Sequence, residues 1–253
     1  MEGRLSLSAA IVLGILSGAG VAIGGYFIGQ GFYAARTGER YVSVKGLAER
    51  EVKADLGTWI ISYTATAASV AEANQTIEQD QKIVVAFAAA HGFANDEIEV
   101  QPTTVTDKYA NQFEGRTPYA NQRYLIKGGI RIRSRKVDQI SLASQDTGGL
   151  VKQGVVLGEN YPQAPQYFFT QLNAIRPAML ADATRSARAV GEQFAADSQS
   201  ALGPIRRASQ GVFEISGRDA SGDTAAGGGA EEASSIAKKV RIVSTIDYYL
   251  VSR

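Results

Sequence analysis

The chain has few side chains that could take part in nucleophilic or acid–base chemistry. It contains one histidine, His91, and no cysteine, so thiolate chemistry, disulfides and cysteine-ligated metals are excluded. A serine or threonine nucleophile activated by histidine would have to use His91. This residue follows an apolar helical run and precedes Gly92, which places it in the last turn of a helix, where it interacts well with the helix dipole. The pattern favours a structural role for His91 over a catalytic one.

Carboxylates are spread along the chain without a pairing pattern. Hydrolysis of the glycosidase type needs two carboxylates on opposite sides of a cleft. The acids considered are Asp55, Glu72, Asp96, Glu97, Asp182, Glu192 and Asp197. A carboxylate-dependent envelope hydrolase is therefore the least favoured function. We predict no enzyme, and no catalytic, cofactor-binding or metal-binding residue.

Basic residues are balanced by acids over the whole chain. Lys plus Arg is 26 and Asp plus Glu is 25, which argues against a nucleic-acid partner. The local cluster at Arg131, Arg133, Arg135 and Lys136 is interleaved with isoleucines. That alternation favours the outer face of an amphipathic strand over an anion site.

The elements that must position these residues begin with a long apolar segment. No charged side chain occurs from Leu5 to Ala35, and the run from Ala9 to Ile28 is apolar except for Ser17. About 20 such residues in a helix span a hydrocarbon core of roughly 30 Å. The run is longer than the apolar part of a cleaved signal, so residues 1–35 are predicted to be an uncleaved transmembrane anchor and residues 36–253 the body.

Small residues recur on one face of this segment. Steps of three or four residues join Gly14, Gly18, Ala22, Gly25 and Gly29. Such spacing permits close packing of two helices, although glycine is also frequent in membrane helices in general, and both interpretations stay open.

The charges on the two sides of the apolar run bear on its orientation. Three basic residues follow the run, Arg36, Arg40 and Lys45, and one precedes it, Arg4. This excess would favour a cytoplasmic body, but the rule is weak for long domains.

Periodicity in the body alternates between strands and helices. Strands are expected at 41–47, 56–68, 97–106, 123–133, 166–170, 205–216 and 239–250. Helices are expected at 69–91, where Ser69 and Glu72 form a capping box, at 137–144, closed by Gly148 and Gly149, and at 172–200. The core side of the last helix is assigned to Ile175, Met179, Val190 and Phe194, and Gly203-Pro204 is expected to end this region.

This order predicts an α+β fold, a largely antiparallel sheet or two lobes packed with helices, preceded by one transmembrane helix. A glycine-, alanine- and serine-rich loop at 217–235 is expected to be mobile. The loop at 107–122 repeats Tyr-Ala-Asn-Gln and carries Tyr109, Phe113 and Tyr119. It is either a solvated turn or a contact site, because exposed aromatic residues are favoured at interfaces.

Several short motifs in a fixed order resemble one protein family. They are Val42–Gly46 with Val52–Asp55, then 182–188 with Phe194-Ala195, then Leu202–Ile205, and the strand Val240–Leu250. Together they resemble the SIMPL-domain family of bacterial periplasmic immunogenic and oxidative-stress-defence proteins, over residues 40–253. The chain departs from it at Ala54, where many relatives have proline, and in keeping its anchor.

The resemblance implies an exported α+β domain with no agreed enzymatic activity and a tendency to self-associate. It supplies no catalytic residues, and it places the body in the periplasm and the anchor in the bacterial inner membrane. The first functional hypothesis is a homo-oligomeric, structural or stress-defence envelope protein whose partners are membrane lipid and its own copies. The second is a module that binds another envelope protein or a ligand through the 107–122 loop.

Overall fold

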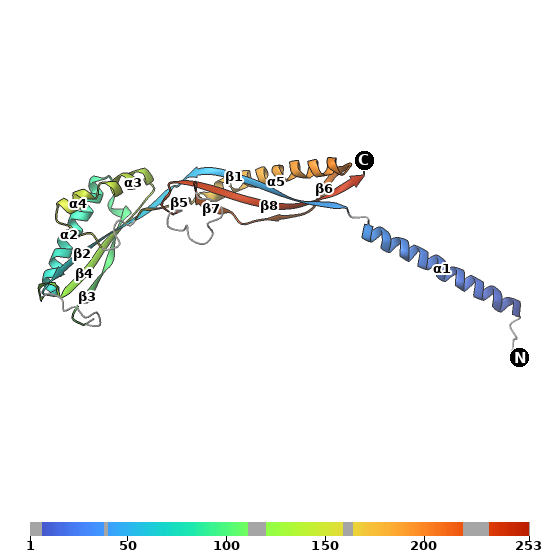
Figure 1. Cartoon of the computed structure of the whole chain (residues 1–253), viewed down its shortest axis with the longest axis horizontal. Helices are drawn as coiled ribbons and strands as arrows, with labels where there is room; N and C mark the ends of the chain where they lie inside the picture. The colour runs from blue at the N-terminus through green and yellow to red at the C-terminus, as the bar shows by residue number, and fades with distance from the viewer. Residues whose placement is uncertain (1–6, 38–39, 111–119, 159–163, 220–232, 253) are drawn as a thin grey trace. The chain divides into compact units, whose positions relative to one another are not determined.

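The computed structural model describes residues 7–37, 40–110, 120–158, 164–219 and 233–252, with the backbone alone at 7–10, 32–37 and 120. The predicted α+β class is confirmed, including the preceding apolar helix (Figure 1). The elements in chain order are α1 Leu7–Thr37, β1 Tyr41–Lys53, β2 Leu56–Ala67, α2 Val70–Ala90, η1 Asn95–Glu97, β3 Ile98–Asp107, η3 Ala120–Gln122, β4 Tyr124–Ser134, α3 Val137–Gln145, α4 Gly148–Lys152, β5 Gln166–Phe168, α5 Leu172–Asp197, β6 Ser200–Gln210, β7 Glu214–Gly217 and β8 Ala237–Ser252.

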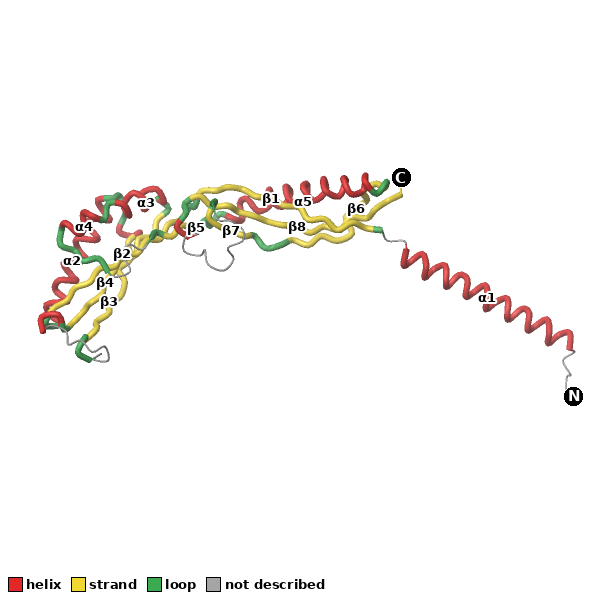
Figure 2. The backbone as a smooth tube through the Cα atoms, viewed as in Figure 1, coloured by secondary structure: helices red, strands yellow, loops and turns green. Residues whose placement is uncertain are grey.

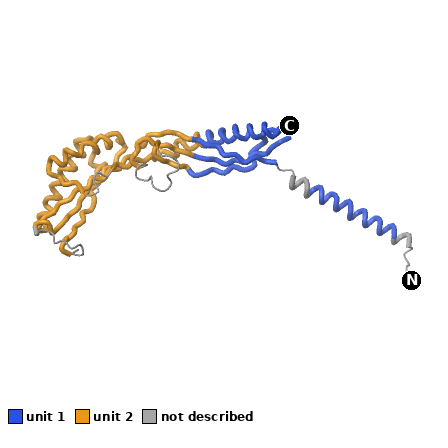
Figure 3. The backbone as a smooth tube through the Cα atoms, in the orientation of Figure 1, with its two compact units in different colours: residues 1–48, 180–212, 242–253 blue, residues 49–179, 213–241 orange. Residues whose placement is uncertain are grey.

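The chain divides into two compact units (Figure 3). Unit 1 comprises residues 1–48, 180–212 and 242–253, and unit 2 comprises residues 49–179 and 213–241. The predicted mobile loop 217–235 has its central part, 220–232, outside the described residues, and Gly217 ends strand β7.

Unit 2 contains a sheet in the order β3-β4-β2-β5, with β4 antiparallel to both of its neighbours. Helices α2, α3 and α4 lie along one face of it (Figure 2). Register places Trp59 opposite Ile132 and Ile61 opposite Ile130, so alternate residues of both strands point to the same face. These four side chains are almost completely buried and form the centre of the core.

Helix α2 begins and ends as the sequence predicts. The Ser69 hydroxyl accepts a hydrogen bond from the Glu72 N–H at 3.3 Å, which satisfies one of the unpaired donors of the first turn. Gly92 adopts φ +82°, a conformation that residues with a side chain rarely adopt, and stops the helix after His91. The buried positions are Ala73, Ile77, Asp80, Val84, Phe87 and Ala88.

Unit 1 packs strands β1, β8 and β6, in that order, against α5. Val44, Ile246 and Tyr248 contact the helix through Ala187. Gly46 allows β1 to come very close to α5, because a Cβ at this position would collide with the carbonyl oxygen of Ala183 and lie 2.7 Å from the Cβ of Ala187. The glycine of the Val42–Gly46 motif is therefore required by backbone packing.

The predicted core side of α5 is wrong in its second half. Val190 is 39% exposed and Phe194 is 53% exposed, whereas Met179 is buried as predicted. The positions that face the interior recur every four residues and are small: Ala183, Ala187, Gly191 and Ala195. Because the sheet lies so close to α5, only small side chains fit between them, and the larger apolar residues point outward.

Several element boundaries also differ from the prediction, and the strand expected at 205–216 is divided into β6 and β7. Strand β1 continues to Lys53, beyond the expected end at 47. Gly148 and Gly149 do not close a helix but begin α4. Gly203-Pro204 lies inside β6 at a register shift, and β6 is an edge strand, which is where a sheet tolerates proline.

Candidate functional site

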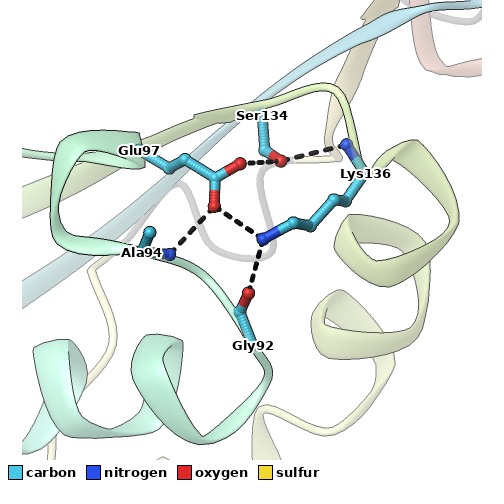
Figure 4. Close-up of polar contacts among 5 residues, drawn as sticks. All are labelled: Gly92, Ala94, Glu97, Ser134 and Lys136. Atoms are coloured by element: carbon cyan, nitrogen blue, oxygen red, sulfur yellow. Dashed lines mark hydrogen bonds and ion pairs between the residues drawn. The ribbon is translucent and has the colours of Figure 1, made fainter.

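A polar network joins the α2–β3 connection of unit 2 to the end of β4 (Figure 4). The Glu97 carboxylate accepts hydrogen bonds from the Ser134 hydroxyl at 2.6 Å, the Ala94 N–H at 2.9 Å and the Lys136 ammonium at 3.0 Å. The same ammonium donates to the Gly92 carbonyl oxygen at 2.7 Å. Every member thus has a partner, and the network holds the turn after α2 against the start of α3.

The electrostatics of Glu97 favour its charged form. Burial raises the pKa of this carboxyl, but the hydrogen bonds from Ser134, Ala94 and Lys136 outweigh it, and the net shift lowers the pKa. Ser134 is 2% exposed, donates to Glu97 and accepts from the Lys136 N–H at 3.0 Å. It is therefore buried and occupied on both sides, which suits a structural hydroxyl and not a nucleophile.

A surface depression of about 400 Å³ lies beside this network. It is lined by Lys53, Ala54 and residues 135–139, at the first turn of α3. Lysine, arginine and a helix N-terminus attract anions, but Lys53 already pairs with Asp138 at 2.6 Å, and Lys136 pairs with Glu97. Of the predicted basic cluster, Arg131 pairs with Glu99 at 3.2 Å and Lys136 pairs with Glu97, in keeping with its interpretation as the outer face of an amphipathic strand.

One titratable residue in the core was not found by sequence reasoning. Asp80 lies on the buried face of α2 and is 5% exposed, and no described residue donates a hydrogen bond to its carboxylate. Burial raises the pKa of Asp80, and burial together with the charge of Asp80 raises the pKa of Tyr63 to about 12. The helical period that makes Ile77 and Val84 core residues also includes position 80, which is the signal that could have found it.

Arg123 joins the two ends of the predicted 107–122 interaction loop, and we call Asp107, Tyr109, Arg123 and Tyr124 the stem of this loop. Arg123 donates to both carboxylate oxygens of Asp107, at 2.8 and 3.2 Å, and its guanidinium lies 5.3 Å from the Tyr109 ring centre and 4.9 Å from that of Tyr124. The Arg123 hydrogen bond lowers the pKa of Asp107. Tyr109 is therefore part of the stem, while Phe113 and Tyr119 lie outside the described residues.

His91 takes the place expected of it. Its Nδ1 lies 2.9 Å from the Phe87 carbonyl oxygen, its Nε2 lies 3.3 Å from the Asp146 carboxylate, and its ring packs on Phe87. Both ring nitrogens thus have partners that fix the end of α2.

Most of the acids named from the sequence already have a hydrogen-bond or ion-pair partner. Asp55 accepts from the N–H and the hydroxyl of Thr170 at 2.8 and 3.0 Å, and Asp182 and Glu192 pair with arginines on their own helix. In the described part of the chain, no three acidic or histidine side chains gather as a metal site needs. The depression above and a second one beside Glu51 each carry a single carboxylate, whereas glycoside hydrolysis uses two.

The five positions of the predicted packing face lie on α1. A Cβ added at Gly14, Gly18, Gly25 or Gly29 would have nothing within 4 Å, and Ala22 is exposed. No described part of the chain covers this face.

The sequence matches the SIMPL family model, described as a protein of unknown function (DUF541), over residues 42–247. The chain belongs to the SIMPL family. The resemblance found in the sequence is thereby confirmed. No curated protein matches the chain.

The SIMPL match begins one residue after the start of β1 and ends within β8, so it includes the sheets of both units and leaves α1 outside. Family membership gives no reaction and assigns no site residue. The function must therefore be inferred from the apolar helix, the loop stem and the surfaces of the SIMPL domain itself.

Proposed function

We propose that this SIMPL protein is a non-enzymatic envelope protein, held in the bacterial inner membrane by α1, with its body in the periplasm and with a structural or stress-defence role. It acts as an assembly of identical copies. The membrane anchor, the self-association and the periplasmic location are three separate claims. Each has its own support and its own test.

The observation that carries the proposal is the exposure of α1. The helix segment Ile11–Gly31 is long and apolar enough to cross a membrane, and none of it is buried by the rest of the chain. Ten large apolar side chains of this segment are 55–77% exposed, and covering them is worth on the order of 15 kcal/mol at roughly 1.5 kcal/mol each. Lipid is the solvent that covers such a helix.

Membrane fractionation tests the anchor. We expect the full-length chain to stay in the membrane pellet after alkaline carbonate extraction and to require detergent for release. N-terminal sequencing of the extracted protein separates an anchor from a signal, because a chain cleaved after the apolar run would lack residues 1–35. Recovery in the aqueous fraction would refute the anchor, and protection of the body from protease added to spheroplasts would refute the periplasmic address.

Self-association is supported by the uncovered small-residue face of α1 and by the resemblance to the family. We expect native mass spectrometry of the detergent-extracted protein to show a defined oligomer. Gly18→Leu places a large side chain on the packing face, whereas Gly20→Leu places the same side chain on the other side of the helix. The first variant should reduce the oligomer and the second should not. A strictly monomeric parent protein would exclude this part of the proposal.

The Arg123 stem favours a second function, a module that presents the 107–122 loop to another envelope protein or a ligand. A loop whose ends are joined by a bidentate ion pair and by contacts of the Arg123 guanidinium with two tyrosine rings loses less conformational entropy on binding than an open one. Deleting residues 111–119 while keeping Asp107 and Arg123 tests it. Loss of a crosslinked foreign partner with intact self-assembly would favour the module.

A further inference from the structure

Strand β1 lies at one edge of the unit 1 sheet. The strand order is β1-β8-β6, so β1 has a neighbouring strand on one side only. At the start of β1, the Leu250 N–H donates to the Arg40 carbonyl oxygen at 2.8 Å. Just past its other end, the Ala54 N–H donates to the Ile236 carbonyl oxygen at 2.8 Å. Between these two bonds both strands advance by equal numbers of residues in opposite directions, so β1 is antiparallel to β8 and has no bulge.

The antiparallel ladder determines which backbone groups of β1 point outward. In such a ladder, residues whose N–H and C=O groups bond the neighbouring strand alternate with residues whose groups point away from it. Arg40 bonds β8, so the even-numbered residues of β1 bond β8 and the odd-numbered ones do not. The N–H and C=O groups of Tyr41, Ser43, Lys45 and Leu47 therefore point away from the sheet, and no described residue bonds them. We call residues 41–47 the β1 edge.

The two edges of the unit 1 sheet differ in their protection against pairing with another strand. Natural sheets protect an edge strand with proline, bulges or charges. The opposite edge strand, β6, contains Pro204 and two register shifts. The β1 edge has no proline and no bulge, and Lys45 is its one charged residue. The β1 edge is thus a template to which another strand can add.

The β1 edge is complementary to itself in one antiparallel register. A two-fold axis at Val44 places Ser43 of one copy opposite Lys45 of the other, and it likewise places Tyr41 opposite Leu47. An axis at Lys45 would instead place two lysines opposite each other, which destabilises a strand pair. An axis at Ser43 would place Leu47 opposite residue 39, which precedes the strand. Tyr41 is 49% exposed and Leu47 is 42% exposed, so the Val44 register covers two exposed side chains from each copy.

Helix α5 leaves room for a second copy beside β1. A Cβ at Gly46 would collide with the backbone of α5, so the helix lies over β1 at this point. Further along the helix, Gly191 lies against Leu202 of β6 and Tyr248 of β8, so α5 crosses the sheet away from the β1 edge. In the Val44 register the two copies of Gly46 lie four residues apart along the strands, which is about 14 Å. Packed helices need about 8–10 Å, so both α5 helices fit on one face of the joined sheet.

We propose that the β1 edge pairs with the β1 edge of a second copy of this chain, with the two-fold axis at Val44. The four opposed pairs of odd-numbered residues then form about eight backbone hydrogen bonds, and the two unit 1 sheets become one sheet. The self-complementary register selects a second copy as the occupant, and a shared membrane would raise the local concentration of copies.

The β1 contact is compatible with packing of the two α1 helices in the same dimer. The two copies of Tyr41 would lie about 20 Å apart along the strands. Each connection from Thr37 to Tyr41 reaches up to about 15 Å, so the two helices can meet. The inference deepens the proposed self-association and rests on it, and its test separates the two.

The absence of cysteine permits register-specific crosslinking of the full chain in membranes. Two differently tagged chains, one with Ser43→Cys and one with Lys45→Cys, are co-expressed and oxidised. Opposed residues of a hydrogen-bonded pair have Cα atoms about 5.5 Å apart, which a disulfide can bridge. Two cysteines at 43, or two at 45, would lie about 9 Å apart, beyond its reach. We expect disulfide dimers that carry both tags, and at least about tenfold fewer that carry one tag twice.

A proline variant tests the same contact without cysteine. Lys45→Pro removes an outward N–H and leaves the ladder with β8 intact, which an edge strand tolerates. Ala208→Pro is the matched control on β6, because Ala208 pairs in register with Ile246, whose backbone groups bond β1. Its N–H therefore also points away from the sheet. Circular dichroism should show folded protein for both variants.

The dimer affinity is measured by native mass spectrometry of detergent-extracted protein with Gly18→Leu, which removes the α1 contact. Lys45→Pro takes two hydrogen bonds from the dimer and should raise its dissociation constant at least about tenfold. Ala208→Pro should leave the dissociation constant unchanged. Equal weakening by the two prolines would overturn the β1 contact.

The crosslinking outcomes separate the β1 contact from self-association itself. Absence of the 43–45 disulfide, in a parent protein that native mass spectrometry shows as an oligomer, would overturn the β1 contact and leave self-association intact. A monomeric parent would overturn both. Disulfides between two residues 43, or between the chain and a foreign protein, would show another arrangement or another occupant and would also overturn the β1 contact.

Discussion

Replacing Gly46 with alanine should destabilise the packing of β1 on α5. The added Cβ would collide with the carbonyl oxygen of Ala183 and lie 2.6 Å from the N of Ala187 and 2.7 Å from its Cβ. Ordinary carbon–carbon contacts are about 3.5–4.0 Å, so the helix would have to retreat by about 1 Å from the strand. The obstacle is helix backbone, which cannot rotate away as a side chain would.

Overpacking of a core costs about 1–3 kcal/mol, and a clash with backbone on several sides argues for the upper end. We therefore expect the free energy of unfolding of Gly46→Ala to fall by about 3 kcal/mol. In a body of this size such a loss lowers the melting temperature by about 6–12 °C. Urea titration of the full chain in detergent, followed by circular dichroism, measures it, and amide exchange of residues 183–191 should locate it in α5.

Gly149→Ala is the matched control, because nothing lies within 4 Å of the added methyl group and the residue is helical. It should stabilise the protein by up to about 1 kcal/mol. Combining Gly46→Ala with Ala187→Gly should not restore stability, because the carbonyl oxygen of Ala183 and the N of Ala187 stay in place and glycine inside a helix costs about 1 kcal/mol relative to alanine. If the free energy of unfolding of Gly46→Ala lies within about 0.5 kcal/mol of that of the parent and amide exchange in α5 is unchanged, then β1 and α5 do not depend on the missing side chain at Gly46.

Three further substitutions test the polar groups of unit 2. Asp80 has a raised pKa in the folded state, so its contribution to stability is present below its ordinary pKa and is lost as pH rises through the folded pKa. Asp80→Asn should therefore stabilise the protein at pH 7 relative to the parent. Urea titrations in which the variant and the parent differ by the same free energy of unfolding at pH 4 and at pH 7 would contradict this. Glu97 has a lowered pKa, so its contribution is present above its ordinary pKa and is lost as pH falls through the folded value; Glu97→Gln should cost about 1–3 kcal/mol at pH 7 and weaken the acid dependence of unfolding. Arg123→Ala should speed amide exchange at Tyr109, whose N–H donates to Asp107, with little change in global stability, and unchanged exchange there would show that the stem does not depend on the ion pair.

Much of unit 2 could be predicted because its signals are local. The alternation in residues 56–67 and 124–134 specifies which face of each strand is buried. In the structure the side chains on that face, such as Trp59 and Ile130, are buried. The Ser69 cap and the Gly92 stop specify the length of α2 without reference to any other element. The structural role of His91 at the end of α2 follows from the same helix boundary.

The polar contacts could not be predicted, because they join residues that are distant in sequence. Glu97 meets Ser134 and Lys136 across the β3–β4 pair, and nothing near Glu97 in sequence indicates these partners. Asp80 lies in a run of polar residues, and its burial depends on the position of β2 over α2. Phe113 and Tyr119 lie outside the described residues, so their part in the 107–122 loop stays a prediction.

The sequence by itself determined the apolar N-terminal helix, the α+β class and most strand positions, because each depends on composition or on a period of two or 3.6 residues along one segment. The SIMPL family followed from the order and spacing of its short motifs. Only the tertiary structure decided which side of α5 is buried. Hydrophobicity selects Val190 and Phe194, but the sheet approaches too closely for them and accepts Ala183 and Ala187 instead. The space between two elements is a property of both, so neither segment alone contains it.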